Sequence, residues 1–322
     1  MRPLASAPRF LTPLAVVAAA LAVVAPSATL AAHSDLLLAL LVLATALGIS
    51  GSQLAGLRRH GAALAILSIV PLIVLAAVAW LIGRPFDHST RDGLLAVGLS
   101  SSEVAAVGLV ALAGEQATIA LGAVTGSLVL AALIGPAAIG ALSAAGGHAG
   151  AGNLLGRFAL VVLLPLAAGI ALRSADRSRR ALERVDGERE GVAALAVAAL
   201  VYAALSGARG AHGLGSALIA SVAFLAISVG LGELWRRRMA PGPTAVPGAF
   251  AIAMRDFAVA AALATQAFGS RAGAVPGVYG VVMLLAGSAA AGRLGRDARR
   301  GGSGAKPPGG SDAGPLAAEP GR

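Results

Sequence analysis

The sequence lacks cysteine altogether, and only 12% of its 322 residues are charged and 3% are aromatic. Without cysteine the chain forms no disulfide, no thiolate metal site and no cysteine nucleophile. Hydrophobic residues make up 57% of the chain, which is too many for a soluble globular domain. The composition therefore predicts an all-α polytopic membrane protein that is surrounded by a lipid bilayer.

Apolar runs alternate with polar or Gly/Pro-rich breaks along the chain. A helix needs about 20 residues to cross a hydrocarbon core of roughly 30 Å, so this length has room for about ten spans and no further soluble domain. The runs that we interpret as spans are 10–32, 35–56, 61–83, 93–113, 117–142, 154–172, 191–207, 213–235, 246–268 and 273–292.

The positive charge is distributed as in a membrane protein. The formal net charge is +10, but most arginines lie between apolar runs, which favours membrane orientation over nucleic-acid binding. With both termini in the cytoplasm, most lysine and arginine lies on the inside, as the positive-inside rule requires. A single lysine among many arginines, with abundant alanine and glycine, is typical of a GC-rich bacterial genome. We therefore expect a multi-pass protein of the bacterial cytoplasmic membrane.

Two halves of five spans each are predicted. The segment EVAAVGLVALAG (103–114) lies about 153 residues before the similar segment DFAVAAALATQA (256–267). An odd number of spans per half inverts the second copy, as in many transporters. The predicted division is 1–142 for spans one to five, 143–293 for spans six to ten with a cytoplasmic loop at 173–190, and 294–322 for a disordered tail. In an alternative interpretation, the first run is a cleaved signal peptide.

Polar residues within the membrane cluster at two places that the repeat sets opposite each other. Span four contains GLSSSEVAAVG, in which three serines are followed by Glu103. Span nine contains AMRDFAVAAAL, with Met254, Arg255 and Asp256. Consecutive serines, or nearby prolines and glycines, weaken a helix. We therefore expect discontinuous fourth and ninth helices that cross at the midplane, where half-helix ends and carboxylates bind ions.

The three charges of this cluster allow several roles. Glu103, Arg255 and Asp256 sum to −1 when all are ionised, and a Na⁺ or H⁺ could neutralise the remainder. Alternatively, Arg255 could bind the carboxylate or sulfonate of a substrate through its guanidinium group. A third alternative is a purely structural pair of Arg255 with Glu103 or Asp256 that pins the crossing helices.

Two segments resemble a known family. The run AIAMRDFAVAAALATQAFG followed by VYGVVMLLAGSAAAG resembles the ninth and tenth spans of the bile acid:sodium symporter superfamily, and GLSSSEVAAVGLVALAGEQATIALGAVTGSLVLAALIGP resembles its fourth and fifth. The resemblance implies a panel domain and a core domain, discontinuous fourth and ninth helices, and alternating access between the two domains.

The sequence departs from that family at its sodium sites. Sodium-coupled members carry Gln-Asn in the ninth span, where this chain has Arg255 and Asp256, and Glu103 falls on the fourth-span asparagine. An arginine beside the site repels Na⁺, so the resemblance is weak support for sodium coupling in this chain. Arsenite-exporting relatives depend on a cysteine that this chain lacks. Glu103 and Asp256 are the candidate Na⁺ ligands. The other side chains that could supply oxygen ligands are Ser101, Ser102, Thr125 and Ser127.

The favoured function is a secondary active transporter of a small organic anion, coupled to Na⁺ or H⁺. The alternative is a non-transporting membrane scaffold or sensory relative with a degenerate ion site. We predict no enzyme, because nothing at membrane depth resembles a nucleophile–base pair or a metal cluster, and no cofactor beyond a coupling ion.

Overall fold

The computed structural model of the chain describes residues 7–49, 51–142, 151–175, 186–207, 213–239 and 242–302. Across these residues the secondary structure is helical, apart from one isolated β-bridge. Each of the ten predicted apolar runs falls on one helix or on consecutive helices. Five helices are long and apolar enough to cross a membrane, namely Leu57–Gly83, Ala117–Ala141, Gly152–Ser174, Leu214–Arg238 and Ser270–Arg296. The chain is therefore an all-α polytopic membrane protein, as its composition predicted.

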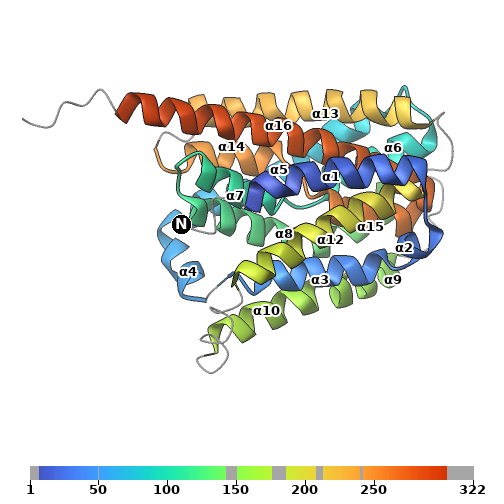
Figure 1. Cartoon of the computed structure of the whole chain (residues 1–322), viewed down its shortest axis with the longest axis horizontal. Helices are drawn as coiled ribbons and strands as arrows, with labels where there is room; N and C mark the ends of the chain where they lie inside the picture. Colours follow the sequence, from blue (N-terminus) through green and yellow to red (C-terminus); the bar gives the residue numbers. More distant parts are fainter. Residues whose placement is uncertain are drawn as a thin grey trace, which may run out of the picture.

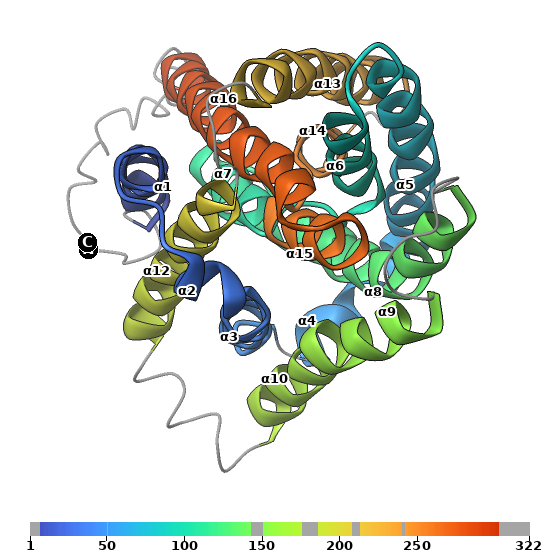
Figure 2. The same ribbon diagram turned by 90° about the vertical axis from the view of Figure 1, so that its right-hand side faces the viewer.

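Four helices form a first cluster, which we call the panel group. In it α3 packs against α10 and α12, and α12 packs against α1 (Figure 2). The short helices α2 (Ala28–Ala32) and α4 (Gly51–Gly56) flank α3 along the chain. The members of the panel group are α1 (Ala7–Val24), α3 (Ser34–Ala46), α10 (Leu164–Ser174) and α12 (Asp186–Ser206).

A second set of helices forms the core group. Here α15 packs on α16 and α6, while α5 packs on α6 and α8 and α13 packs on α14 and α16 (Figures 1 and 2). The core group consists of α5 (Gly61–Gly83), α6 (His88–Leu99), α7 (Ala105–Leu112), α8 (Ala117–Leu142), α13 (Leu214–Leu234), α14 (Ala245–Ala253), α15 (Phe257–Phe268) and α16 (Ser270–Gly302).

One helix connects the two groups. Its first part, α9 (Ala151–Phe158), packs against α8 of the core group, whereas α10 at its end packs against α3 of the panel group. Between them lies a π-helical turn, η3 (Ala159–Leu163). A single helix therefore changes partners from one group to the other at a π-bulge, a place where helices commonly bend.

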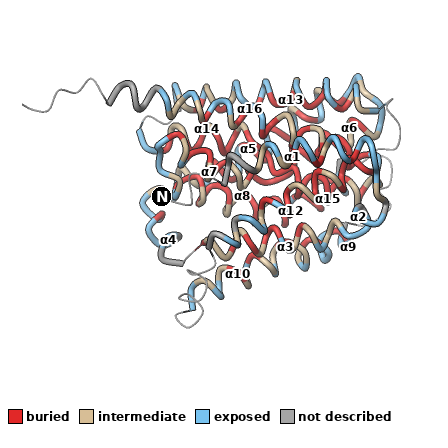
Figure 3. Tube along the Cα trace, viewed as in Figure 1, coloured by how far each residue is buried: buried red, intermediate tan, exposed pale blue. Residues whose placement is uncertain are grey.

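Burial increases toward the middle of the bundle (Figure 3). Nine residues of α15 are buried, whereas α5 and α13 each present a row of exposed aliphatic side chains, among them Ile73 and Ile219. Exposed apolar surface on this scale marks contact with a membrane or a partner. In a chain of this composition it is the surface that faces lipid.

The two predicted interruptions are present. Helix α6 ends at Leu99 and α7 begins at Ala105, while α14 ends at Ala253 and α15 begins at Phe257. Serine side chains compete with the helical hydrogen bonds of the backbone, which accounts for the first break. Asp256 accounts for the second, because its side chain caps α15 and thereby starts a new helix.

Two predicted boundaries are corrected. The loop at 173–190 is shorter than predicted, since α10 continues to Ser174 and α12 already begins at Asp186. The predicted tail starts too early, since α16 continues to Gly302. The tail beyond 302 and the loop at 176–185 lie outside the described residues.

Candidate functional site

The two helix interruptions meet through reciprocal backbone hydrogen bonds. The amide of Glu103 donates to the carbonyl of Met254 at 2.9 Å, and the amide of Asp256 donates to the carbonyl of Ser101 at 2.8 Å. Between these bonds Ser102 and Arg255 form an antiparallel β-bridge. The two buried segments thus satisfy each other's backbone groups, which is the condition for non-helical chain inside a membrane.

Both carboxylates of the site accept hydrogen bonds from backbone amides at the N-termini of half-helices. Asp256 Oδ1 accepts hydrogen bonds from the amides of Ala258 at 2.9 Å and Val259 at 3.0 Å, at the start of α15. Glu103 Oε1 accepts from the amide of Ala105 at 3.3 Å, at the start of α7. Negative charge is stabilised at these positive dipole ends. The protein's own carboxylates therefore occupy the positions where half-helix ends would otherwise attract an anion.

In each carboxylate, the second oxygen makes fewer or longer hydrogen bonds than the first. Asp256 Oδ2 accepts one long hydrogen bond, from Ser101 Oγ at 3.4 Å. Glu103 Oε2 is buried and has no hydrogen-bond partner among the described residues. The charges of Glu103 and Asp256 lie close enough to repel each other. A buried pair of like charges with an unpartnered oxygen is suited to binding a cation or a proton.

The serines of the site mainly support the crossing. Ser102 Oγ donates to the carbonyl of Ala251 at 2.8 Å, and the amide of Ser102 donates to Ser127 Oγ at 2.9 Å. Ser127 in turn donates to the carbonyl of Val124 at 3.0 Å. Thr125 donates to the carbonyl of Leu121 at 2.8 Å, within its own helix. The structure thus brings these predicted oxygen donors to the site, and each hydroxyl proton already has a backbone acceptor.

Arg255 is enclosed in the core group with its guanidinium unpaired. The residue is 0% exposed, and none of its three guanidinium nitrogens has a hydrogen-bond partner among the described residues. The alternative of a structural ion pair with Glu103 or Asp256 is therefore absent from this structure. The backbone amide of Arg255 donates to Tyr279 Oη at 3.0 Å, and Tyr279 donates to the carbonyl of Ala253 at 3.3 Å.

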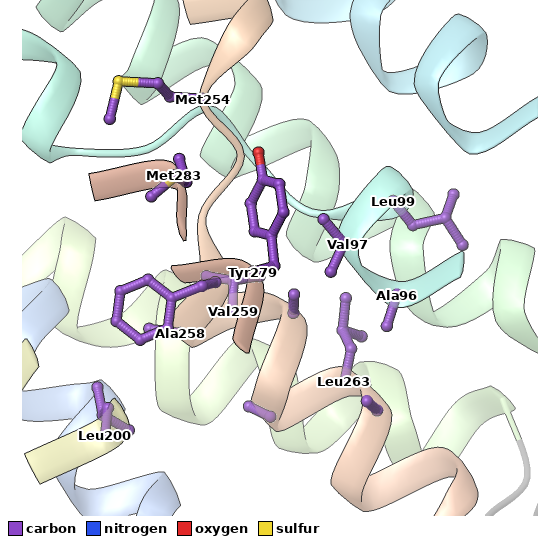
Figure 4. Packing of buried hydrophobic residues seen from close by; sticks show 14 of the residues in the cluster. Ala96, Val97, Leu99, Leu200, Met254, Ala258, Val259, Leu263, Tyr279 and Met283 are labelled. Carbon is purple, nitrogen blue, oxygen red and sulfur yellow. The ribbon is translucent and has the colours of Figure 1, made fainter. Parts of the chain in front are cut away.

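Tyr279 is a site residue that the sequence interpretation missed. It lies fully buried between Met254 and Val97 (Figure 4). Its ring packs edge-on against Phe224. The chain has only two tyrosines, and a phenol within an apolar run needs a polar partner. This need for a partner is the feature of the sequence that could have indicated Tyr279 as a site residue. Met254, by contrast, contributes only its carbonyl oxygen to the site. Its side chain packs instead against Gly287 of α16.

A cavity of about 380 Å³ separates the two helix groups on one side of the crossing. It extends from Val104 and Ala105, at the start of α7, to α1, α3 and α12 of the panel group. Aliphatic side chains dominate its lining, and the polar members are Thr12, Thr45, Gln53, Thr118, Arg189 and Ser288. A second, much smaller cavity touches Asp256 and Thr125. Arg255 lines neither of these two cavities.

The opposite end of the bundle, at the right in Figure 1, is closed by a polar contact between the groups. Asp35 of α3 accepts from Arg157 Nε at 2.7 Å and from Gln266 Nε2 of α15 at 2.8 Å. One carboxylate thus joins a panel helix to a core helix. We call these three residues the Asp35 clamp.

Two interrupted helices of this membrane protein cross at buried carboxylates, and a cavity lies beside the crossing. This architecture is typical of a membrane transport protein. The chain belongs to the SBF-like CPA transporter family, which matches it over residues 10–285. The predicted relationship to bile acid:sodium symporters is thereby confirmed, and membership of a transporter family argues against an enzyme. No curated protein matches the chain.

Proposed function

We propose that this protein is a secondary active transporter of a small organic anion, coupled to Na⁺ or H⁺ and located in a bacterial cytoplasmic membrane with both termini inside. The observation that carries the proposal is the reciprocal crossing of two interrupted helices, each of which presents a carboxylate at the start of its second half. Half-helices that meet in this way are typical ion-binding elements of secondary transporters.

The crossing supports a five-plus-five inverted repeat. Glu103 pairs with Met254 in the same manner as Asp256 pairs with Ser101, so a local two-fold relation exchanges the two breaks. Residues 1–142 and 143–293 would be the two repeats, with the crossing at the bilayer midplane. Inverted halves offer a transporter two states of similar energy, because each half can adopt the conformation of the other.

The coupling cation would bind between Glu103 and Asp256. Glu103 Oε2 and Asp256 Oδ2 are the oxygens with capacity left, and Ser101 lies beside them. Arg255 lowers the net negative charge of the region without pairing with either carboxylate. This combination fits one monovalent ion, since two carboxylates and one arginine leave a single negative charge.

The substrate anion would bind in the cavity between the groups. Arg189 is the cationic side chain of its lining, and it also donates to the carbonyl of Ala44 at 3.0 Å. Movement of the core group against the panel group would close this cavity and open the opposite end, where the Asp35 clamp now joins α3 to α15. Arg255 contributes charge to the cation site, and the predicted direct contact between Arg255 and the substrate finds no support in its enclosed position.

The first experiment tests the cation site without a guess at the substrate. Thermal unfolding of the detergent-purified full chain is compared in matched NaCl and KCl from pH 5 to 9 for wild type, Glu103→Gln and Asp256→Asn. A cation that binds only the folded protein stabilises it by about 2.7 kcal/mol at one hundred times its Kd. Glu115→Gln is the matched control, because this exposed carboxylate lies in the turn after α7.

We expect a rise in melting temperature with Na⁺, or on acidification, that disappears in both site variants and persists in the control. Proteoliposomes would then be assayed for uptake of small carboxylates and sulfonates driven by the same cation. Equal melting in Na⁺ and K⁺ at every pH, with no difference between wild type and site variants, would rule out a cation site at this crossing and favour a non-transporting relative.

A further inference from the structure

A narrow apolar groove lies on the outer surface of the core group, between α5 and α13. Its volume is about 110 Å³, and its lining consists of aliphatic side chains and one tryptophan. Ile66 and Val70 of α5 and Leu234 of α13 are 43%, 46% and 45% exposed along it. Trp235 forms one wall and is held in place because its indole nitrogen donates to the carbonyl of Thr244 at 3.2 Å.

Basic residues gather at one end of this groove. Trp235 is the first residue of the π-helical turn η5 (Trp235–Met239), which continues with Arg236, Arg237 and Arg238. On the other side, the turn η2 (Leu57–His60) leads into α5 and carries Arg58 and Arg59. The groove begins about two turns after η2, at Ile66, so both arginine sets flank the same mouth.

The cluster keeps a net positive charge. Glu233 is the only acidic residue in α13, η5, η2, α5 and α14, and it accepts hydrogen bonds from both Arg236 and Arg237. Arg58, Arg59 and Arg238 are exposed. Several arginines against one carboxylate leave an anion-attracting mouth on a groove that is otherwise apolar.

We propose that this groove binds one anionic phospholipid, with its acyl chain between α5 and α13 and its phosphodiester headgroup at Arg237, Arg238 and the η2 arginines. Apolar grooves between transmembrane helices with basic residues at the membrane surface have the chemistry that recognises such lipids. The groove also reaches Ile252 of α14, one turn before Arg255. A bound acyl chain therefore contacts the half-helix that leads into the crossing. This inference does not depend on the proposed transport activity.

The chain provides its own reporter for the site. It contains only two tryptophans, so Trp80→Phe leaves Trp235, in the wall of the groove, as the single tryptophan. The full chain is reconstituted in phosphatidylcholine vesicles that contain a small fraction of a brominated lipid. This lipid is either phosphatidylglycerol or phosphatidylcholine, in each case with a brominated acyl chain. Bromine quenches tryptophan on contact, so the fluorescence of Trp235 measures which lipid occupies the groove.

We expect brominated phosphatidylglycerol to quench Trp235 at a several-fold lower mole fraction than brominated phosphatidylcholine. Arg238→Gln should reduce this preference about fivefold, and Arg237→Gln with Arg238→Gln further, because an arginine at an anionic membrane surface contributes about a factor of five. Two controls remove the same charge elsewhere: Arg271→Gln at the start of α16, and Arg173→Gln at the end of α10. Both should keep the preference.

Three results would overturn the proposal. The first is equal quenching by the two brominated lipids. The second is an equal loss of preference in Arg173→Gln and Arg238→Gln, which would assign the effect to general surface charge. The third is removal of the preference by millimolar inorganic phosphate, which would indicate a site for phosphate itself. Each arginine substitution is also made together with Trp235→Phe, and the fluorescence of the remaining Trp80 verifies in parallel that the variant is folded and inserted.

Discussion

Ser102 and Arg255 lie opposite each other in an antiparallel bridge, and this single pair joins the two interruptions of the core group. Ser102 is held from both sides, by Ala251 through its hydroxyl and by Ser127 through its amide. Arg255 has its amide bound to Tyr279 and its guanidinium unpaired. The amides at the centre of the crossing are therefore hydrogen-bonded, whereas the guanidinium of Arg255 has no hydrogen-bond partner among the described residues.

The support by Ser127 can be tested by substitution. Ser127→Ala leaves the buried amide of Ser102 without its acceptor, and an unsatisfied buried donor costs about 1–3 kcal/mol. We expect a clearly lower melting temperature in detergent. Ser221→Ala is the matched control, because Ser221 on α13 is equally buried and its hydroxyl has no partner among the described residues. Equal effects of the two substitutions would contradict the assigned role of Ser127.

Replacement of Arg255 should leave the fold intact. An unpaired charge at membrane depth costs at least about 2.5 kcal/mol, so Arg255→Met should melt at or above the temperature of wild type. Without the arginine, Glu103 and Asp256 attract a cation more strongly, so the stabilisation by Na⁺ or by acidification should increase. Arg157→Met, which removes a half-exposed ion pair to Asp35, should cost no more than about 1 kcal/mol. Strong destabilisation by Arg255→Met would reveal a structural role for its guanidinium.

The Asp35 clamp should control access from its end of the bundle. Asp35→Ala removes the acceptor shared by Arg157 and Gln266, so the closed end should open more often. The cysteine-free chain allows a direct measurement: Ala262→Cys places a thiol at a buried position between the groups at this end. We expect its labelling by a membrane-impermeant maleimide to become several-fold faster with Asp35→Ala. Arg271→Ala, which removes an exposed charge at the same end, should leave the rate unchanged.

A helix cap outside the spans gives a pH-dependent prediction. Asp87 precedes α6, and hydrogen bonds from Ser89 and Thr90 lower the pKa of its carboxyl below the ordinary value. A lowered pKa means that the stabilisation is present near neutral pH and is lost as the pH falls through the folded-state pKa. Asp87→Ala should cost about 1 kcal/mol at pH 7 and progressively less in acid. Asp87→Ser keeps a capping oxygen, and its melting should not share this acid dependence.

The two interruptions and their charged residues were predictable from the sequence because they depend on local chemistry. Three successive serines before Glu103 weaken a helix wherever they occur, and Asp256 caps whatever helix follows it. The offset between the two segments also matched Glu103 with Asp256, and in the structure each of these residues forms one of the two reciprocal backbone hydrogen bonds of the crossing. The inverted repeat behind that offset stays a prediction. The end of α16 was misjudged, because an arginine-rich stretch looks like a loop in a hydropathy pattern but is a favourable helix C-terminus.

The amino-acid sequence by itself determined the class of the protein, the helical runs and the places where two of them break, since hydropathy and helix propensity act over neighbouring residues. Tertiary structure alone decided that Arg255 is fully buried and lines neither of the two cavities, that Tyr279 binds its amide, and that Asp35 joins α3 to α15. Each of these depends on contacts between segments far apart in the chain. Such contacts follow from the packing of whole helices, which no local pattern of residues specifies.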